Sequence, residues 1–388
     1  MNSLPVAAGG KRCRAAPARG DVRLLPVSSS QAPPAHDLAS LLKELSGLPG
    51  PSGGELAVGR RVAELLAPYS HSVRHDALGN CIAFKEGQGQ APRPRIMLAA
   101  HMDEIGLIVT RVEEGGFLRV ANVGGVDPRA LVAQEVIVHA DAPLPGYIGV
   151  KPPHLLTPQE RDKAIPLDEM FIDVGMPEDE VRRRIPPGTL VTVLREPMQL
   201  LGGRIAGKAL DNRASMAALV EAMRLLSGLH HVADVYAVAT VQEEVGLRGA
   251  ITSTYGILPD MAVAIDVGFA SQPGLPEDRV FPMGKGPSLA FGANIHPRLF
   301  SMLLDAAKAN NVPHQLEPMP AASGTDGWAM QVTQSGVPTA VISIPLRYMH
   351  TSVEVVDVED VRQTARLLAH LVASLTAADR EGWRYDLT

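Results

Sequence analysis

The chain has 388 residues, 46% hydrophobic and 20% charged, a length that predicts two domains or one large domain with an insertion. Its two cysteines, Cys13 and Cys81, exclude a disulfide framework and a cysteine-based zinc finger, and they favour a reducing, cytoplasmic location. The net charge of −6 argues against nucleic acid or an anionic membrane surface as a partner, and no apolar run reaches the roughly 18 residues that a membrane helix needs.

The first 36 residues differ in composition from the rest of the chain. They are rich in Ala, Pro, Ser and Gly, which predicts a disordered tail; a targeting arm is the alternative. Order is expected to begin at Asp37, which can cap a helix running through 41–45. A second amphipathic helix is expected from Glu55 onward. The apolar run 95–100 then predicts a strand that is covered on both faces.

The middle third of the chain has a different pattern of predicted secondary structure. Between 106 and 203, short runs of strand-forming residues alternate with turn signals such as Gly124-Gly125. Only one short helix is expected there, over 178–184. This pattern is typical of a small β-barrel or sandwich.

Alternation of strands and helices returns after Asp211. Helices are expected over 213–226 and 358–377, and strands over 235–241, 261–265 and 339–344. The predicted organisation is a tail (1–36), an α/β catalytic domain in two pieces (37–105 and 204–388) and an inserted β-barrel domain (106–203).

Five acidic or imidazole groups occupy comparable positions in this scheme. Four come directly after a predicted strand, and the fifth opens a helix; they are His101-Met102-Asp103, Glu243-Glu244, Asp266, His350 and Asp211-Asn212-Arg213. In open α/β sheets, binding sites form in the crevice beyond the carboxyl ends of the strands. Side chains far apart in the sequence can therefore meet there.

The types of these side chains favour metal chemistry. Two histidines and several carboxylates, without cysteine, suit divalent ions such as Zn²⁺, Co²⁺ or Mn²⁺. Two neighbouring ions need one carboxylate between them. Glu243 and Glu244 offer a metal ligand beside a base that takes a proton from water, and Asp103 can orient the imidazole of His101.

Each residue also has an ordinary structural interpretation. Asp211 alone suits a helix cap, Glu243-Glu244 suits a solvated turn, and His350 suits a polar loop. Asp266 fits this interpretation least well, because a buried carboxylate without a partner is costly. From the residues alone, both interpretations stay open.

The ordered motifs resemble one known family. Seven segments carry the resemblance, in order along residues 37–380: 100–106 (AHMDEIG), 149–154 (GVKPPH), 209–213 (ALDNR), 242–250 (QEEVGLRGA), 264–267 (AIDV), 324–326 (GTD) and 349–354 (MHTSVE). They are similar to those of the tetrahedral, or TET-type, aminopeptidases of metallopeptidase family 42, which belong to the di-zinc peptidase clan. Any one motif is weak, but the ordered set is specific.

The resemblance implies a fold and a set of roles. The fold is a mixed α/β catalytic domain with an inserted PA-like β-barrel. Two divalent ions per subunit are implied, zinc first, with cobalt or manganese as alternatives. The implied roles are His101 and Asp266 on one ion, Glu244 and His350 on the other, Asp211 bridging both, Glu243 as general base and acid, and Asp103 behind His101.

The resemblance also implies partners. Substrates would be peptides with a free N-terminus, and the subunits would form a homo-oligomer, a dodecamer built from dimers. This chain departs from the family pattern in its N-terminal extension and at Gly327-Trp328, where smaller residues are common. The second departure leaves the first-residue specificity open.

Three other functions remain alternatives. A di-zinc amidohydrolase or deacylase would use the same ions on N-acylated amino acids. A non-catalytic relative would keep the fold without the chemistry, against which the full set of ligands argues. A glycoside hydrolase could use two carboxylates, but it would leave the histidines without a role, and aromatic residues for sugar stacking are only 4% of the chain.

Overall fold

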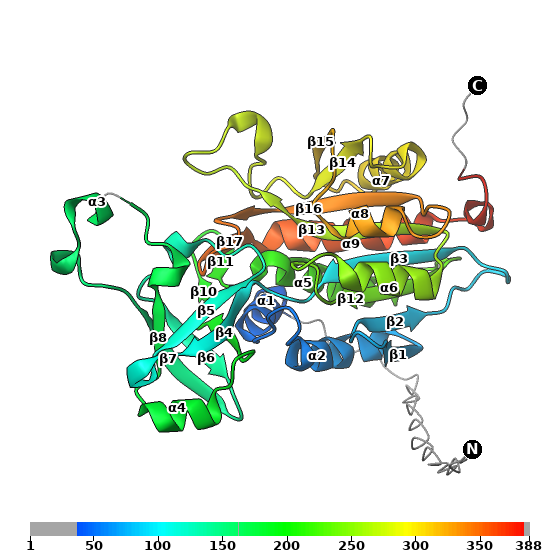
Figure 1. Ribbon diagram of the computed structural model, residues 1–388. Helices are drawn as coiled ribbons and strands as arrows, with labels where there is room; N and C mark the ends of the chain where they lie inside the picture. The colour runs from blue at the N-terminus through cyan, green and yellow to red at the C-terminus, as the bar shows by residue number, and fades with distance from the viewer. Residues whose placement is uncertain (1–36, 162, 384–388) are drawn as a thin grey trace, which may run out of the picture.

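The structure, a computed structural model, describes residues 37–161 and 163–383. The tail predicted for residues 1–36 lies outside this part of the chain. Figure 1 shows a large helix-flanked sheet with a closed barrel at one end. This is the expected fold class, a mixed α/β structure that carries a small β-barrel.

The large sheet has 11 strands. Their bounds are β1 (Ser72–His75), β2 (Cys81–Lys85), β3 (Arg95–His101), β10 (Met198–Gln199), β11 (Arg204–Gly207), β12 (Asp234–Thr240), β13 (Met261–Phe269), β14 (Ser288–Gly292), β15 (Gln315–Met319), β16 (Thr339–Arg347) and β17 (Glu354–Asp357). The main path runs β1-β2-β12-β3-β13-β16-β17-β11-β10, and β14 joins β16 to β15.

Four strands at the centre of this sheet are parallel. β12 pairs with β3, β3 with β13, and β13 with β16, all in the same direction. Each residue of β13 before Phe269 is buried, as expected for a strand with both faces covered. The carboxyl ends of these four strands therefore meet at one edge, where a crevice forms.

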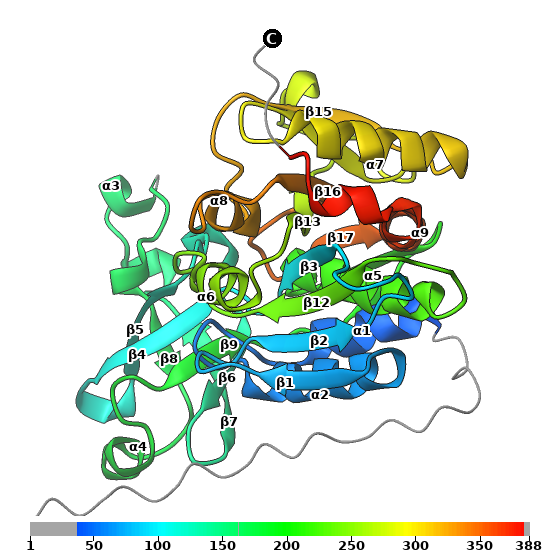
Figure 2. The same cartoon turned by 90° about the vertical axis from the view of Figure 1, so that its right-hand side faces the viewer.

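Helices cover both faces of the sheet (Figure 2). Their bounds are α1 (Leu38–Gly47), α2 (Leu56–Leu66), α5 (Leu210–Leu226), α6 (Arg248–Ile257), α7 (Pro297–Ala309), α8 (Asp326–Gln331) and α9 (Val358–Ser374). α5 and α9 pack together on one face, and α6 and α8 pack on the other. None of the helices in the described ranges is long and apolar enough to cross a membrane.

The first helix shows how local sequence positions these elements. The Asp37 carboxylate accepts a hydrogen bond from the Ser40 amide and caps α1, as predicted. Leu41, Leu42 and Leu45 are buried on one side of the helix. That apolar stripe packs α1 against α5, and α5 begins beside the crevice.

The barrel closes in the order β4-β5-β8-β7-β6-β9. Its strands are β4 (Gly106–Val112), β5 (Leu118–Val123), β6 (Glu135–His139), β7 (Pro143–Gly149), β8 (Phe171–Asp173) and β9 (Leu190–Val193), accompanied by α3 (Pro158–Arg161) and α4 (Glu178–Arg184). Neighbouring strands are antiparallel. The barrel has its own apolar core, separate from that of the sheet.

These barrel strands lie inside the segment 106–203 that was expected to form an insertion. The short strand β10 also lies in that segment, but it pairs with β11 in the large sheet. The division of the chain into domains at 106 and 203 stays a prediction.

Candidate active site

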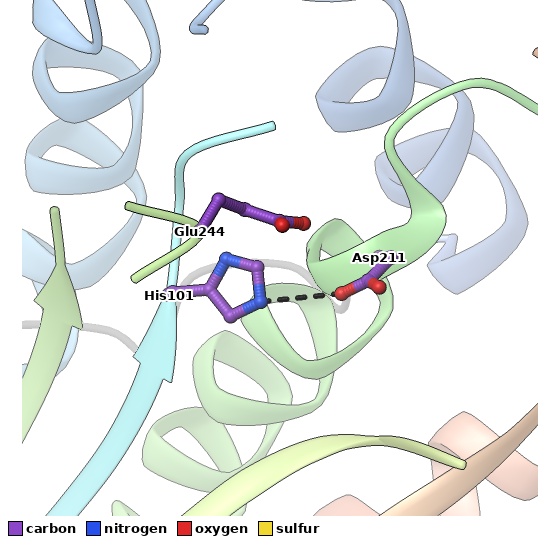
Figure 3. Close-up of side chains that lie close together, drawn as sticks. All are labelled: His101, Asp211 and Glu244. Carbon is purple, nitrogen blue, oxygen red and sulfur yellow. Dashed lines mark ion pairs between the residues drawn. The ribbon is translucent and has the colours of Figure 1, made fainter. Parts of the chain in front are cut away.

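His101 ends the parallel strand β3 and is 2% exposed. Its Nε2 lies 3.2 Å from Asp211 Oδ1 and 3.7 Å from Asp266 Oδ1. Figure 3 shows the imidazole directed at Asp211, with Glu244 close by. The structure therefore brings together around one imidazole three acidic side chains that come at least 110 residues later in the chain.

His350 approaches the same cluster from beyond the end of β16. Its Nε2 lies 3.5 Å from Asp211 Oδ2 and 3.4 Å from Glu244 Oε1. Asp211 thus presents one carboxylate oxygen to each histidine. The Glu244 side chain is 7% exposed, whereas that of His350 is 35% exposed, so the cluster opens to solvent on the His350 side.

Asp103 lies behind His101 and is completely buried. Its Oδ1 lies 3.5 Å from Nδ1 of His101, on the ring edge opposite to Asp211. The same carboxylate accepts hydrogen bonds from the amides of Glu243 and Glu244 and from the hydroxyl of Ser52, at 3.0, 3.2 and 2.6 Å. Asp103 therefore orients the imidazole and holds the Glu243-Glu244 loop.

Two further side chains, to which sequence reasoning gave no role, extend this support. The Val241 amide donates to Asn80 Oδ1 at 3.0 Å, and the Gln242 amide donates to Glu55 Oε1 at 3.1 Å. With the two bonds to Asp103, side chains accept from four consecutive amides. Because Gln242 has a φ of +55°, a conformation that L residues rarely adopt, these bonds hold an unfavourable turn in place.

A second buried carboxylate had no assigned role. Glu354 is 2% exposed and accepts hydrogen bonds from the amides of Asp211 and His350. Asn212, next to Asp211, donates to the carbonyl of Ile265 beside Asp266. Backbone acceptors and donors of this kind leave no periodic signal in a sequence, so only the fold reveals them.

Asp326 is a third carboxyl group of this kind. It is 2% exposed, it accepts a hydrogen bond from the Thr240 hydroxyl, and its Oδ1 has no partner among the described residues. Burial raises its pKa to about 7, opposed by the charge of His101. The segment 324–326 was part of the family resemblance, but spacing gave Asp326 no function.

The electrostatics show that the cluster lacks positive charge. Burial raises the pKa of Glu243 to about 10, with His101 opposing and the Asp266 carboxylate reinforcing that shift. Hydrogen bonds to Asp211 and Glu244 raise the pKa of His350 to about 11. Both shifts favour the protonated form, as expected where buried carboxylates outnumber positive charges.

The donor set fits divalent ions. One ligand atom from each of His101, Asp211 and Glu244 lies within 4.8 Å of the others. Imidazole and carboxylate donors suit zinc and its neighbours among the transition metals. A buried group of carboxylates that is short of cations is costly unless ions or protons neutralise it.

Comparison with known proteins places this arrangement in a family. The chain matches the family described as M42 glutamyl aminopeptidase over residues 79–367. The chain belongs to the M42 glutamyl aminopeptidase family. Its members are metal-dependent aminopeptidases, so the chain is a hydrolase with that activity.

Individual relatives align with this M42 peptidase over nearly their whole length. The lysyl aminopeptidase of Pyrococcus furiosus is 39% identical over 346 residues, 87% of this chain and 98% of that protein. A TET aminopeptidase from a marine sediment Thaumarchaeota archaeon is 34% identical with a TM-score of 0.84, covering 89% of this chain and 99% of the other. The TET1 peptidase of Pyrococcus horikoshii, which can assemble into a tetrahedron or a large octahedral shell, is 29% identical with a TM-score of 0.77, covering 87% and 100%.

A small pocket adjoins the acidic cluster of the M42 peptidase at His350. Its walls come from the barrel and from the loops around Ile105 and Ala209. Lys208, which also lines it, is paired with Glu104 at 2.8 Å. Trp328, at which this chain departs from the family pattern, is 43% exposed on α8 and does not line this pocket.

Proposed function

We propose that the chain removes N-terminal residues from peptides with the help of two divalent ions held between its two histidines. The position of Asp211 carries this proposal, because its two carboxylate oxygens face His101 and His350 separately. A carboxylate placed in this way suits the bridging ligand of a two-metal site.

The distances between the side chains support the roles that the family resemblance implies for the metal ligands. His101 and Asp266 would hold one ion, Glu244 and His350 would hold the other, and Asp211 would contribute to both. Zinc is the proposed metal, and cobalt and manganese suit the same donors. The raised pKa values of Glu243 and His350 support this assignment, because the site is built to accept positive charge.

Glu243 is the proposed general base and acid. When bound, divalent ions polarise the scissile carbonyl group and lower the pKa of water. A Glu243 carboxylate oxygen then takes a proton from the attacking water and delivers it to the leaving nitrogen. Asp103 fixes the tautomer of His101, because its carbonyl oxygen accepts from Nδ1–H at 3.2 Å and its carboxylate lies beside the same nitrogen. That carboxylate also accepts from the Glu243 amide, so that the Glu243 carboxylate stays in place.

The proposed assembly is a dodecamer built from dimers. The tetrahedral arrangement described for the TET1 relative supports it. The proposed location is the cytoplasm, which the buried thiol of Cys81 supports, since it forms no disulfide within the described residues; Cys13 lies outside them. A sizing measurement of the full chain tests the assembly.

An assay with free and blocked substrates tests the function. Aminoacyl-anilides with a free N-terminus are expected to be cleaved in the presence of Zn²⁺, Co²⁺ or Mn²⁺, and the same compounds with an N-acetyl group are not. Glu243→Gln is expected to lose orders of magnitude in turnover while it still binds the ions. Cleavage of only the acetylated compounds would support a deacylase, and normal turnover by Glu243→Gln would refute the role of that residue.

A further inference from the structure

Glu354 connects two proposed ligands that come from different parts of the chain. It begins β17, and both of its carboxylate oxygens accept hydrogen bonds from backbone amides. Oε2 accepts from Asp211 N–H at 2.9 Å, and Oε1 accepts from His350 N–H at 2.9 Å. One rigid side chain thus joins the backbone of the bridging carboxylate to that of the exposed histidine.

Both amides belong to residues with irregular backbone. His350 has a φ of +62°, a left-handed conformation that is unfavourable for residues other than glycine. Asp211 has a φ of −80° and a ψ of 103°, so it is not helical although α5 continues after it. A fixed acceptor is needed at each amide, because regular secondary structure does not hold these residues in position.

The anchor itself is firmly placed. β17 pairs with β11 on one side and with β16 on the other, and the residues of β17 are buried. Ala206 and Gly207 of β11, opposite β17, lead directly to the segment that carries Asp211. The position of Glu354 is therefore set by the sheet and not by the loops that it holds.

We propose that Glu354 is a positioning residue that sets the separation of Asp211 and His350 and thereby the affinity for the divalent ion that these two residues share. This inference rests on the proposed function. It gives a role to a residue that touches neither substrate nor ion, and that acts only through the two amides.

The substitution Glu354→Gln tests the inference with little change in volume. Glutamine has a single acceptor oxygen, so one of the two amides loses its partner and faces an NH₂ group. A buried donor without a partner moves or costs free energy. Loss of such an outer contact reduces metal affinity by about 10–100-fold in other sites, and that range is expected here.

A matched control exists in the same chain. Asp360 is buried and accepts from the amides of Gly284 and Gly286, both at 2.7 Å. It holds two amides as Glu354 does, but neither belongs to a proposed ligand. Asp360→Asn is therefore expected to leave ion binding unchanged.

The experiment is a calorimetric titration of Zn²⁺, and separately of Co²⁺ followed by its visible absorption, into ion-free protein. The unaltered chain is expected to bind two ions. Glu354→Gln is expected to bind the ion shared by Asp211 and His350 10–100-fold more weakly, and to weaken binding of the other ion, which Asp211 also contacts, by less. Circular dichroism of the ion-free variants checks folding, and Glu354→Asp, with a carboxylate too short to reach both amides, replaces the glutamine variant if that one does not fold.

The outcomes separate the two proposals. A selective loss in Glu354→Gln with normal binding by Asp360→Asn supports the inference. Equal affinities in all three proteins, or an equal loss in both variants, overturn the inference and leave the proposed function standing. Failure of the unaltered chain to bind two ions overturns the proposed function and the inference together.

Discussion

A Cβ atom added at Gly125 would lie 2.7 Å from Nδ1 of His350. The Nε2 atom of the same ring faces Asp211 and Glu244. The neighbouring Gly124 is also close to the cluster, since a Cβ there would lie 3.2 Å from Glu244 Oε2. The loop that follows β5 of the barrel thus lies against the exposed side of the proposed metal site, where only glycine leaves room for the imidazole.

Gly125→Ala is therefore expected to displace the His350 ring. The expected result is a fall in kcat on the order of 10- to 100-fold, because small errors in the position of reacting groups have effects of that size. Gly256→Ala in α6 is the control, since a Cβ there meets nothing within 4 Å. Steady-state kinetics on an aminoacyl-anilide measures both, and equal activities would show that the glycine is not needed.

Removal of the ions is expected to lower the thermal stability of the protein. Ligands that bind only the folded state stabilise it, by about 2.7 kcal/mol at a concentration 100 times Kd. A chelator is therefore expected to lower Tm, and Zn²⁺, Co²⁺ or Mn²⁺ to restore it. His350→Ala should show a smaller restoration and Glu243→Gln a full one; an unchanged Tm of the parent chain in chelator would contradict the metal site.

Asp360 gives a prediction about pH that does not involve the metal site. Burial raises its pKa from the ordinary value of 3.8 to about 6 in the folded protein. Between these values the folded state holds a proton that the unfolded state has lost, so this group's contribution to stability falls as pH rises from about 4 to 6. Above pH 6 the contribution is constant.

Asp360→Asn is expected to remove that part of the pH dependence. Urea midpoints of the two proteins, measured at several values between pH 4.5 and pH 7.5, give the comparison. The difference in urea midpoint between variant and parent should change with pH below pH 6 and stay constant above pH 6. If the plots of urea midpoint against pH ran parallel for the two proteins over the whole range, Asp360 would not titrate in this window.

Glu55 is expected to support catalysis through the loop that carries the base. Its Oε1 accepts from the amides of Gly53 and Gln242, so Glu55→Ala releases the turn at Gln242. We expect kcat to fall by about 10–100-fold, as for other contacts that hold a ligand segment, with a smaller change in KM. Glu55→Gln should recover much of the activity, because its amide oxygen can accept both bonds.

Glu64→Ala is the control for Glu55, since the Glu64 side chain is 65% exposed on the same helix. Its activity should match that of the parent chain. Failure of Glu55→Gln to recover activity would show that the charge of Glu55, and not its hydrogen bonds, is what matters.

The parts of the fold that sequence reasoning located are those with a strong periodic signal. The apolar run before His101 is β3, and the apolar run before Asp266 is the first part of β13. Polar residues directly after such runs lie at the carboxyl ends of strands, so their meeting in the structure follows from parallel pairing. The barrel was also visible, because turn residues separate its short strands.

Other parts gave no signal of this kind. β10 has two residues and β17 has four, too few for a period to appear. Glu354 and Glu55 act on backbone amides, and any chain segment provides such amides. Their partners depend on which loops the fold brings near, a long-range property that spacing along the chain does not contain.

The barrel is inserted in the chain between His101 and Asp211, which are adjacent in the acidic cluster. β4 leaves the sheet shortly after His101, and the returning chain reaches Asp211 soon after β11. Short segments therefore connect the barrel directly to His101 and to Asp211. A shift of the barrel relative to the large sheet would therefore change the separation of His101 and Asp211, even if its cause lay far from the acidic cluster.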